Sequence, residues 1–526
     1  MERRGVLLDK SVSENKGPKY TTSDLNTIKG EDHLGIRSVG ISIADRLQSG
    51  ITSITPRARY WSFFAWVLYD FIENGRVEKT MLNFKQHLKR QEWYFILANI
   101  ADAEAKHSKT HELIGSTKGI EIWNRNQDPI IPKPDYVKNA LGGYGTYRRV
   151  MKIAGITAVG DEAEGVYIDR LTQPLGKQLA QAFEANIKHT EYFQEYRFLD
   201  EPVPRHVIFQ YGQAVNLDRL KEESSKDRSI LEDIFLPKEP KNERHSYRKD
   251  SMLYYMAIIH QSEGEKLTFN RMQVKMFDDF AQKNLNIPDQ LHNVAIGWEI
   301  YQARQYFTYS VDTIWSYLLN RMSKRIMKMD ELIDTTLTDL VDNFHDLNQH
   351  GLHGMATFPL DPYKRNQFIT DMRDEAYHVT SHVWQPLIVM MDMYDRMSRR
   401  RDFENFHHDL LDLGGRDGIS FSTWIRFVDS SSTKSLYNII GYILRYFILE
   451  QHQKVALNKM LTTNNETYHF IENDGYLYFE KNDRPVFNTF RVNQGLSILN
   501  DLGYVSKNSG LHHVEPIGLV RLNGSY

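Results

Sequence analysis

One predicted helix carries three side chains at the spacing of metal ligands. Glu375, His378 and His382 stand at positions i, i+3 and i+7, so a helix through them places all three on one face. Carboxylates and imidazoles bind zinc and related ions, and a bound ion could activate water for attack on a phosphoester. Histidines at this spacing more commonly pack or form hydrogen bonds. The metal site is therefore a hypothesis, and a metal-dependent phosphohydrolase or nuclease is the alternative function that it implies.

Two arginines stand where the start of a helix disfavours positive charge. Thr55 is a typical N-cap residue and Pro56 a typical first helical residue, which places Arg57 and Arg59 in the first turn. Free backbone N–H groups already present positive charge there. We expect an acidic group to offset the arginines, either a carboxylate from elsewhere in the fold or a phosphate from a partner. Arg57 and Arg59 are therefore predicted binding residues.

Two further predicted helices present polar or basic faces. A helix over residues 144–154 carries a basic face suited to phosphate contact, and a helix over residues 489–502 turns polar side chains outward, where they could reach base edges or phosphates. The predicted binding residues are Arg148, Arg149 and Lys152 on the first helix and Arg491, Asn493 and Gln494 on the second. Acidic residues at 161, 162 and 164 would repel DNA beside the first helix. Packing against protein is an equal alternative for that helix.

Several catalytic signatures are absent from the chain. There is no cysteine, which excludes disulfides, thiolate catalysis and cysteine-bound metals. The glycine-rich run at 142–145 lacks the Lys-Ser/Thr pair of a phosphate-binding loop, and no serine-nucleophile elbow occurs. We therefore expect no catalytic residue and no cofactor, and a protein that is not an enzyme unless the metal hypothesis holds.

Length and composition indicate a multi-domain globular protein. The chain has 526 residues, which is too long for a single hydrophobic core. Its shares of hydrophobic (41%) and charged (25%) residues are those of an ordinary globular protein. A net charge of −3 argues against coating of nucleic acid by bulk attraction but leaves local basic patches open. No apolar run is long enough for a bilayer or a signal peptide. We expect a cytoplasmic protein without membrane contact.

The predicted fold is mainly α and multi-domain, with helical bundles and two winged-helix-like α+β modules. The first module would combine the helix at 144–154 with a β-rich stretch at 156–168 and a helix at 172–183. The second would follow a long helix at 435–461 and a hairpin turning at Asn473-Asp474-Gly475. The expected parts are a flexible arm (1–30), an N-terminal helical domain (31–134), a winged-helix-like module (135–200), a linker region (201–250), a central helical domain (251–434) and a C-terminal winged-helix-like domain (435–526).

The first 75 residues resemble a known family. The similarity lies in Leu34-Gly35-Ile36-Arg37-Ser38, Ile43-Ala44-Asp45-Arg46-Leu47, Gly50-Ile51-Thr52 and Thr55-Pro56-Arg57-Ala58-Arg59-Tyr60, with looser matches at 171–176 and 491–503. These motifs resemble an uncharacterised bacterial family, a domain of unknown function associated with phage-defence islands. Gln48-Ser49 departs from its pattern. The family has no established catalytic residue to carry over. Arg57, Arg59 and Tyr60 match its most distinctive motif, so the resemblance implies that these three residues form a shared binding site.

The resemblance implies a non-enzymatic component of a bacterial antiphage or anti-plasmid defence system. We expect a scaffold or adaptor that binds DNA, a partner ATPase or nuclease, or both. The metal-dependent enzyme remains one alternative. A DNA-binding transcriptional regulator that reads DNA through residues 491–500 is another, although the chain is longer than a repressor needs.

Overall fold

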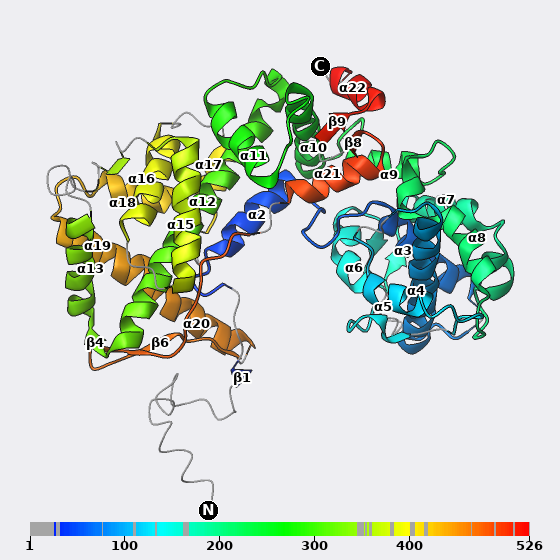
Figure 1. Ribbon diagram of the computed structural model, residues 1–526, viewed down its shortest axis with the longest axis horizontal. Coiled ribbons are helices and arrows are strands. Elements are labelled where there is room, and N and C mark those ends of the chain that lie inside the picture. The colour runs from blue at the N-terminus through cyan, green and yellow to red at the C-terminus, as the bar shows by residue number, and fades with distance from the viewer. Residues whose placement is uncertain are drawn as a thin grey trace, which may run out of the picture. The chain divides into compact units, whose positions relative to one another are not determined.

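A computed structural model describes most of the chain, and its residues fall into two compact units (Figure 1). The described residues are 26–27 and 32–524, apart from 76, 109–111, 132–133, 161–167, 344–351, 353–354, 357–359, 379–382, 400–404, 415–418, 464, 489–490 and 509–510. Only the backbone is described at 26–27, 134, 269, 373–378, 405, 465 and 508. Unit 1 comprises Met1–Ala44, Met276–Gln282 and Ile296–Asn488, and unit 2 comprises Asp45–Lys275, Lys283–Ala295 and Thr489–Tyr526.

Unit 2 is mainly helical and contains the arginine motif. Its elements are α3 (Arg59–Tyr69), η1 (Asp70–Asn74), α4 (Met81–Ala105), α5 (Ser116–Trp123), η2 (Pro134–Tyr136), α6 (Tyr144–Ile153), β2 (Thr157–Ala158), β3 (Arg170–Leu171), α7 (Leu175–Ile187), η4 (Tyr192–Tyr196), α8 (Arg205–Val215), η5 (Leu217–Lys221), α9 (Arg228–Phe235), α10 (Glu243–Gln261), α11 (Phe269–Val274), η7 (Asp289–Leu291), α21 (Val492–Asp501), β8 (Val505–Asn508), β9 (Leu511–Val514) and α22 (Pro516–Asn523). Residues 201–250, expected as a linker region, form α8, η5, α9 and the start of α10.

Helix α3 is the centre of the unit 2 core because almost every side chain along it is buried. Phe63 stacks on Phe95 of α4 with ring centroids 4.1 Å apart, and it meets Phe183 of α7 edge to face at 5.9 Å. Helices α4 and α8 approach closely at Gly212, where a Cβ would lie 2.3 Å from the carbonyl oxygen of Ala98. Large aromatic side chains and one glycine contact thus hold the helices that carry the motif.

The end of the chain forms a helix followed by a hairpin. Helix α21 ends before Gly503, whose φ of +78° is the left-handed conformation that terminates many helices. Strands β8 and β9 then pair antiparallel, with Val505 opposite Val514. The helix predicted at 489–502 is present as α21, although residue 489 lies outside the described residues.

Unit 1 is also mainly helical. Its elements are β1 (Asn26–Thr27), most of α2 (Arg37–Leu47), most of η6 (Lys275–Asp279), most of α12 (His292–Lys324), β4 (Met327–Lys328), α13 (Met329–Asn343), α15 (Pro362–His378), α16 (Trp384–Ser398), α17 (Asn405–Asp412), α18 (Phe421–Asp429), α19 (Leu436–Tyr442), η8 (Ile443–Leu449), α20 (Glu450–Thr463), β5 (Asn465–Glu466), β6 (Phe470–Asn473) and β7 (Tyr476–Phe479). The predicted long helix at 435–461 is present as α19, η8 and α20, and it includes a π-helical segment.

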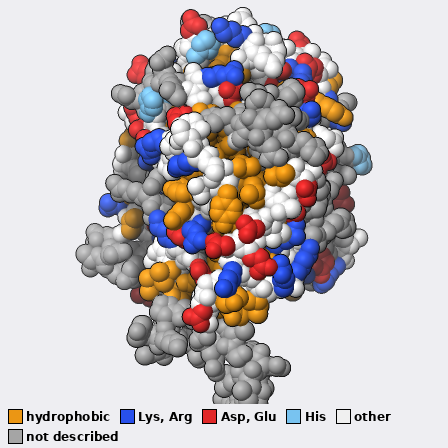
Figure 2. All heavy atoms as spheres, turned by 90° about the vertical axis from the view of Figure 1, so that its left-hand side faces the viewer, with side chains coloured by type: hydrophobic (Ala, Val, Ile, Leu, Met, Phe, Trp, Pro, Cys, Tyr) orange, Lys and Arg blue, Asp and Glu red, His pale blue; other side chains and the backbone are white. Residues whose placement is uncertain are grey.

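Unit 1 contains a three-stranded sheet in the order β4-β7-β6. The hairpin β6–β7 turns where the sequence predicts, with positive φ at Asp474 and Gly475 (+53° and +77°) as a two-residue type I′ turn requires. Figure 2 shows hydrophobic side chains among charged ones on the side where α13 and α19 lie in Figure 1. The exposed aromatic residues of α19 and η8 are Tyr437, Tyr442 and Tyr446.

The mainly helical class is confirmed, and the strands form only small sheets. The acidic segment of the first predicted module, residues 161–167, lies outside the described residues, and β2 and β3 on either side of it pair antiparallel. Within the part of the chain that is described, no helix is long and apolar enough to cross a membrane.

Candidate functional site: the Arg57–Arg59 motif and its two cavities

The helix of the motif begins later than the sequence predicts. Helix α3 starts at Arg59, with Ala58 as its cap, so the prediction that Thr55 caps it is wrong. The Thr55 hydroxyl instead accepts a hydrogen bond from the Thr52 backbone N–H at 3.1 Å and closes a local turn. The carboxylate of Asp501 takes over the capping role, because it accepts from the Ala58 N–H at 2.9 Å.

Arg57 is buried in an ion-pair cluster. Only 4% of the residue is exposed, and its Nε donates to Asp501 Oδ1 at 3.0 Å while its Nη2 lies 2.7 Å from Asp218 Oδ1. Burial alone would lower the pKa of Arg57, but Asp501 and Asp218 raise it above its usual range. A carboxylate from elsewhere in the fold, one of the two expected sources of negative charge, is present at Arg57.

Arg59 is buried on a different side of the motif. It is 1% exposed, its Nη1 donates to the carbonyl oxygen of Asn216 at 2.6 Å, and its Nε lies 3.5 Å from Asp227 Oδ2. Asp227 is held by two other donors, the Ser62 hydroxyl at 2.5 Å and Asn186 Nδ2 at 2.7 Å. Both motif arginines therefore have an aspartate partner within unit 2.

Tyr60 belongs to the hydrophobic core. Its ring stacks on Phe64 with centroids 5.4 Å apart, and its hydroxyl accepts a hydrogen bond from the Ile114 N–H at 3.0 Å. Burial raises the pKa of Tyr60, and the negative charge of Glu92 adds to that effect. Tyr60 thus supports the motif from inside the fold rather than from its surface.

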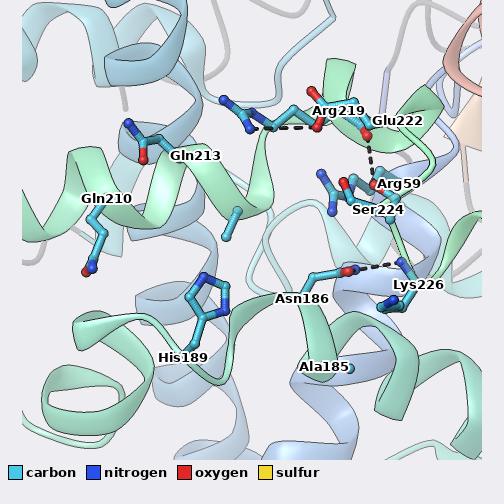
Figure 3. Close-up of a pocket in the computed structure, with 12 residues that line it drawn as sticks. Arg59, Ala185, Asn186, His189, Gln210, Gln213, Arg219, Glu222, Ser224 and Lys226 are labelled. Atoms are coloured by element: carbon cyan, nitrogen blue, oxygen red, sulfur yellow. Dashed lines mark hydrogen bonds and ion pairs between the residues drawn. The ribbon is translucent and has the colours of Figure 1, made fainter.

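The two arginines line two separate cavities. Arg57 lines an open cavity of about 770 Å³ together with residues of α21, η5, α11 and the β8–β9 hairpin. Arg59 lines a second cavity of about 430 Å³, between α7, α8 and the segment that joins η5 to α9 (Figure 3). One sequence motif therefore contributes a guanidinium group to the wall of each cavity.

The predicted face of α21 divides into a buried and an accessible part. Asn493 is exposed and lines the larger cavity. Ser497 and Asn500, one and two turns further along, are half-buried and line the same cavity. Arg491 and Gln494 are buried instead, so their expected outward orientation is wrong. Arg491 pairs with Asp45 through its Nη1, which draws its side chain away from the cavity face.

Close packing explains the buried part of α21. Helix α10 reaches α21 at Gly495, where a Cβ would lie 2.7 Å from a ring carbon of Tyr255. The hydroxyl of Tyr255 donates to Gln48 Oε1 at 2.6 Å, and Gln48 Nε2 donates to the backbone oxygen of Arg491 at 3.2 Å. Gln48 therefore holds the start of this helix.

The basic face of α6 is largely neutralised. Arg148 Nε lies 2.5 Å and Lys152 Nζ 2.8 Å from the buried carboxylate of Asp169, while Arg149 is exposed. Burial would raise the pKa of Asp169, but hydrogen bonds from Arg148, Lys152 and Tyr144 lower it overall. A phosphate at this face would have to compete with Asp169.

The metal hypothesis falls outside what is described. The backbone of Glu375 and His378 belongs to α15, but the side chains of both, and the whole of His382, lie outside the described residues. Among the side chains that are described, no three His, Asp or Glu are grouped so that they could hold a metal ion. The alternative function therefore remains a prediction without a described site.

Sequence reasoning missed most of the residues that surround the motif. Asp218, Asp227 and Asp501 stand 161, 168 and 444 positions from the arginines they pair with. The cations Arg219 and Lys226 of the smaller cavity lie in a charged segment that resembles an ordinary solvated loop. No local pattern in the sequence links these segments to the motif.

No family model matches the chain, and neither a curated protein nor a solved structure does.

Proposed function

We propose that the chain is a non-enzymatic adaptor or scaffold of a bacterial antiphage or anti-plasmid system. In this proposal it holds a partner ATPase or nuclease subunit. The resemblance of its first 75 residues to a family associated with phage-defence islands supports the setting. The cavity beside α21 supports the role, and it is the single observation on which the proposal depends.

The α21 cavity has the chemistry of a site for a polypeptide segment. Asn493, Ser497 and Asn500 offer amide and hydroxyl groups on one wall, and buried Leu496 and Met272 add apolar surface. Such a mixture suits an extended chain, whose backbone needs both donors and acceptors.

Two atoms near this wall have unused hydrogen-bonding capacity. Ser506 Oγ and His512 Nδ1, both on the hairpin that lines the cavity, are buried and make no hydrogen bond to any described residue. Buried polar atoms are normally paired, so a bound partner segment is a natural source of the missing contacts.

Charge favours a protein over a nucleic acid in this cavity. Lys507 and Arg57 are its cations, but Arg57 is already paired with Asp218 and Asp501, and Glu112 adds a third carboxylate. A phosphate backbone would meet more negative than positive charge there. An adaptor that binds a partner protein in this cavity is therefore better supported than one that binds duplex DNA there.

DNA is the second candidate partner. Helix α21 followed by the β8–β9 hairpin has the order of a recognition helix and wing, and Lys507 is exposed on that hairpin. We propose the C-terminal segment as a winged-helix-like module on this basis. Binding that weakens steeply with salt and depends on Lys507 would favour DNA over protein.

The test is co-expression of the full chain with the ATPase or nuclease encoded beside it. Complex formation is measured by size-exclusion chromatography with light scattering, and protection by counting phage plaques. Ser497→Arg places a long cation in the cavity, and we expect it to abolish both complex and protection. Gln86→Arg, at an exposed position of α4, is the matched control and should change neither.

Three results would contradict the proposal. One is a gene neighbourhood without an ATPase or nuclease. Another is a chain that forms no complex with such a neighbour. The third is a complex and a level of protection that Ser497→Arg leaves intact.

A further inference from the structure

The cavity beside Arg59 is separate from the α21 cavity, and its lining has a different character. We propose that it binds a small phosphate-bearing ligand of about mononucleotide size. This inference does not depend on the partner-binding role of α21. It rests on guanidinium groups whose donors are largely unused, on the local charge and on the size of the cavity.

Arg59 has more donors than the described structure employs. A guanidinium group carries five N–H donors. Arg59 makes one hydrogen bond, from Nη1 to the carbonyl oxygen of Asn216, and its buried Nε has no hydrogen-bond partner among the described residues, since Asp227 lies 3.5 Å away. A nearly fully buried guanidinium group in a cavity wall therefore retains capacity for an acceptor.

Arg219 repeats this feature on the same cavity. Its nearest carboxylates are Asp102 at 3.5 Å and Glu222 at 3.7 Å, and its buried Nε likewise lacks a hydrogen-bond partner among the described residues. Asp102 is also held by Lys106 at 2.7 Å and by Asn216 Nδ2 at 2.7 Å. Arg219 therefore forms only long ion pairs with the carboxylates of the fold.

The charge of the lining favours an anion. Arg59, Arg219 and Lys226 are cationic, whereas Glu222 is the one carboxylate in the described lining and its side chain is 45% exposed. Two guanidinium forks and an ammonium group match the oxygens of a phosphate, which accept several short hydrogen bonds at once. The α21 cavity, with three carboxylates against two cations, has the opposite balance.

The rest of the lining suits an organic group attached to the phosphate. Figure 3 shows Gln210, Gln213 and His189 across the cavity from Asn186 and Lys226. Gln210 Oε1 accepts a hydrogen bond from the Glu191 N–H at 3.1 Å, and this bond does not use the N–H donors of the Gln210 amide. A volume of about 430 Å³ lies within the range of small-molecule sites. Amides and an imidazole can bind a polar ring, so a nucleoside phosphate fits the whole cavity.

Isothermal titration calorimetry on the full chain at low salt tests the inference. The probes are AMP, inorganic phosphate and citrate, the last as an anion without phosphorus. We expect AMP to bind more tightly than inorganic phosphate and citrate not to bind. Arg219→Ala should weaken AMP at least tenfold and Lys226→Ala severalfold. Lys138→Ala, which removes an exposed lysine of the same unit outside the cavity, should leave binding unchanged.

Arg59 itself is a poor test residue, since its removal would leave Asp227 without a cation in the core. Arg219→Lys is the conservative variant, and partial recovery of binding relative to Arg219→Ala is expected. Equal affinity for AMP and inorganic phosphate would assign the site to free phosphate and overturn the organic part of the proposal. The whole proposal is overturned if citrate binds as well as AMP, if neither phosphate probe binds, or if the Arg219 and Lys226 variants bind normally.

Discussion

The Asp501 carboxylate offers the sharpest test of how the arginine motif is stabilised. It is buried, and it both pairs with Arg57 and caps helix α3 through the Ala58 N–H. Removing one partner of a buried ion pair costs about 3–5 kcal/mol, because the other charge is left unpaired. Asp218 remains 2.7 Å from Arg57, so we expect the lower end, about 3 kcal/mol, for Asp501→Ala.

Two further variants separate charge from hydrogen bonding. Asp501→Asn keeps an acceptor for the Ala58 N–H, worth about 1 kcal/mol, so it should cost about 2 kcal/mol. Asp218→Asn is the control, because that carboxylate pairs with the same arginine but its side chain is 55% exposed. A partly exposed pair contributes little, and we expect a loss below about 1 kcal/mol.

Hydrogen exchange measured by mass spectrometry under urea provides the assay, since it reports the stability of each unit separately. Peptides from α3 should lose protection in Asp501→Ala, while peptides from α16 in unit 1 serve as the internal reference. Arg57→Met combined with Asp501→Leu should recover much of the loss, since both charges are then removed. The reasoning is refuted if Asp501→Ala lowers the free energy of unfolding no more than Asp218→Asn does. It is also refuted if the loss in the double variant equals the sum of the losses in the two single variants.

Three other predictions concern buried groups elsewhere. Burial raises the pKa of Glu92 to about 7 from 4.5, so its contribution to stability is complete below about pH 4.5 and is lost as the pH rises to about 7. Between pH 4.5 and pH 8 the free energy of unfolding, measured in urea, should therefore fall by about 3 kcal/mol because of Glu92, and Glu92→Gln should abolish this fall. An unchanged pH dependence in the variant would contradict the prediction. Burial lowers the pKa of His452 to about 3 from 6.5, so its contribution is complete above about pH 6.5 and is lost as the pH falls. Unit 1 should lose about 2 kcal/mol between pH 6.5 and pH 5 through this residue, and hydrogen exchange of His452→Gln should show a correspondingly shallower pH slope. Gly212→Ala should destabilise unit 2 by about 2 kcal/mol because its Cβ would collide with a backbone oxygen, whereas Gly441→Ala, with 3.4 Å to its nearest neighbour, should be neutral or stabilising by up to about 1 kcal/mol; thermal unfolding of the two variants in opposite order would refute the packing argument.

The sequence predicted those helices and turns that depend on a few consecutive residues. It predicted the helices now seen as α6 and α21, and the Asn-Asp-Gly run predicted the turn of the β6–β7 hairpin. Gly503 follows α21 in the left-handed conformation, which glycine adopts at little cost whatever lies nearby. The start of α3 was misplaced by three residues, since the Thr55 hydroxyl has a competing partner in its own turn.

The sequence alone indicated that the motif needs negative charge, because positive charge is disfavoured at the start of a helix. That reason holds for Arg59, in the first turn of α3, but the prediction that Arg57 also lies in that turn is wrong, since Arg57 precedes the cap Ala58. Which groups supply the negative charge was decided by the tertiary structure. Asp501 is 444 positions from Arg57, and the partners of Arg59 come from segments more than 150 positions away. Chain folding brings such groups together through packing of distant helices, and no short stretch of sequence records that proximity. The same reason explains why two cavities, each lined by one arginine of a single motif, emerge only in three dimensions.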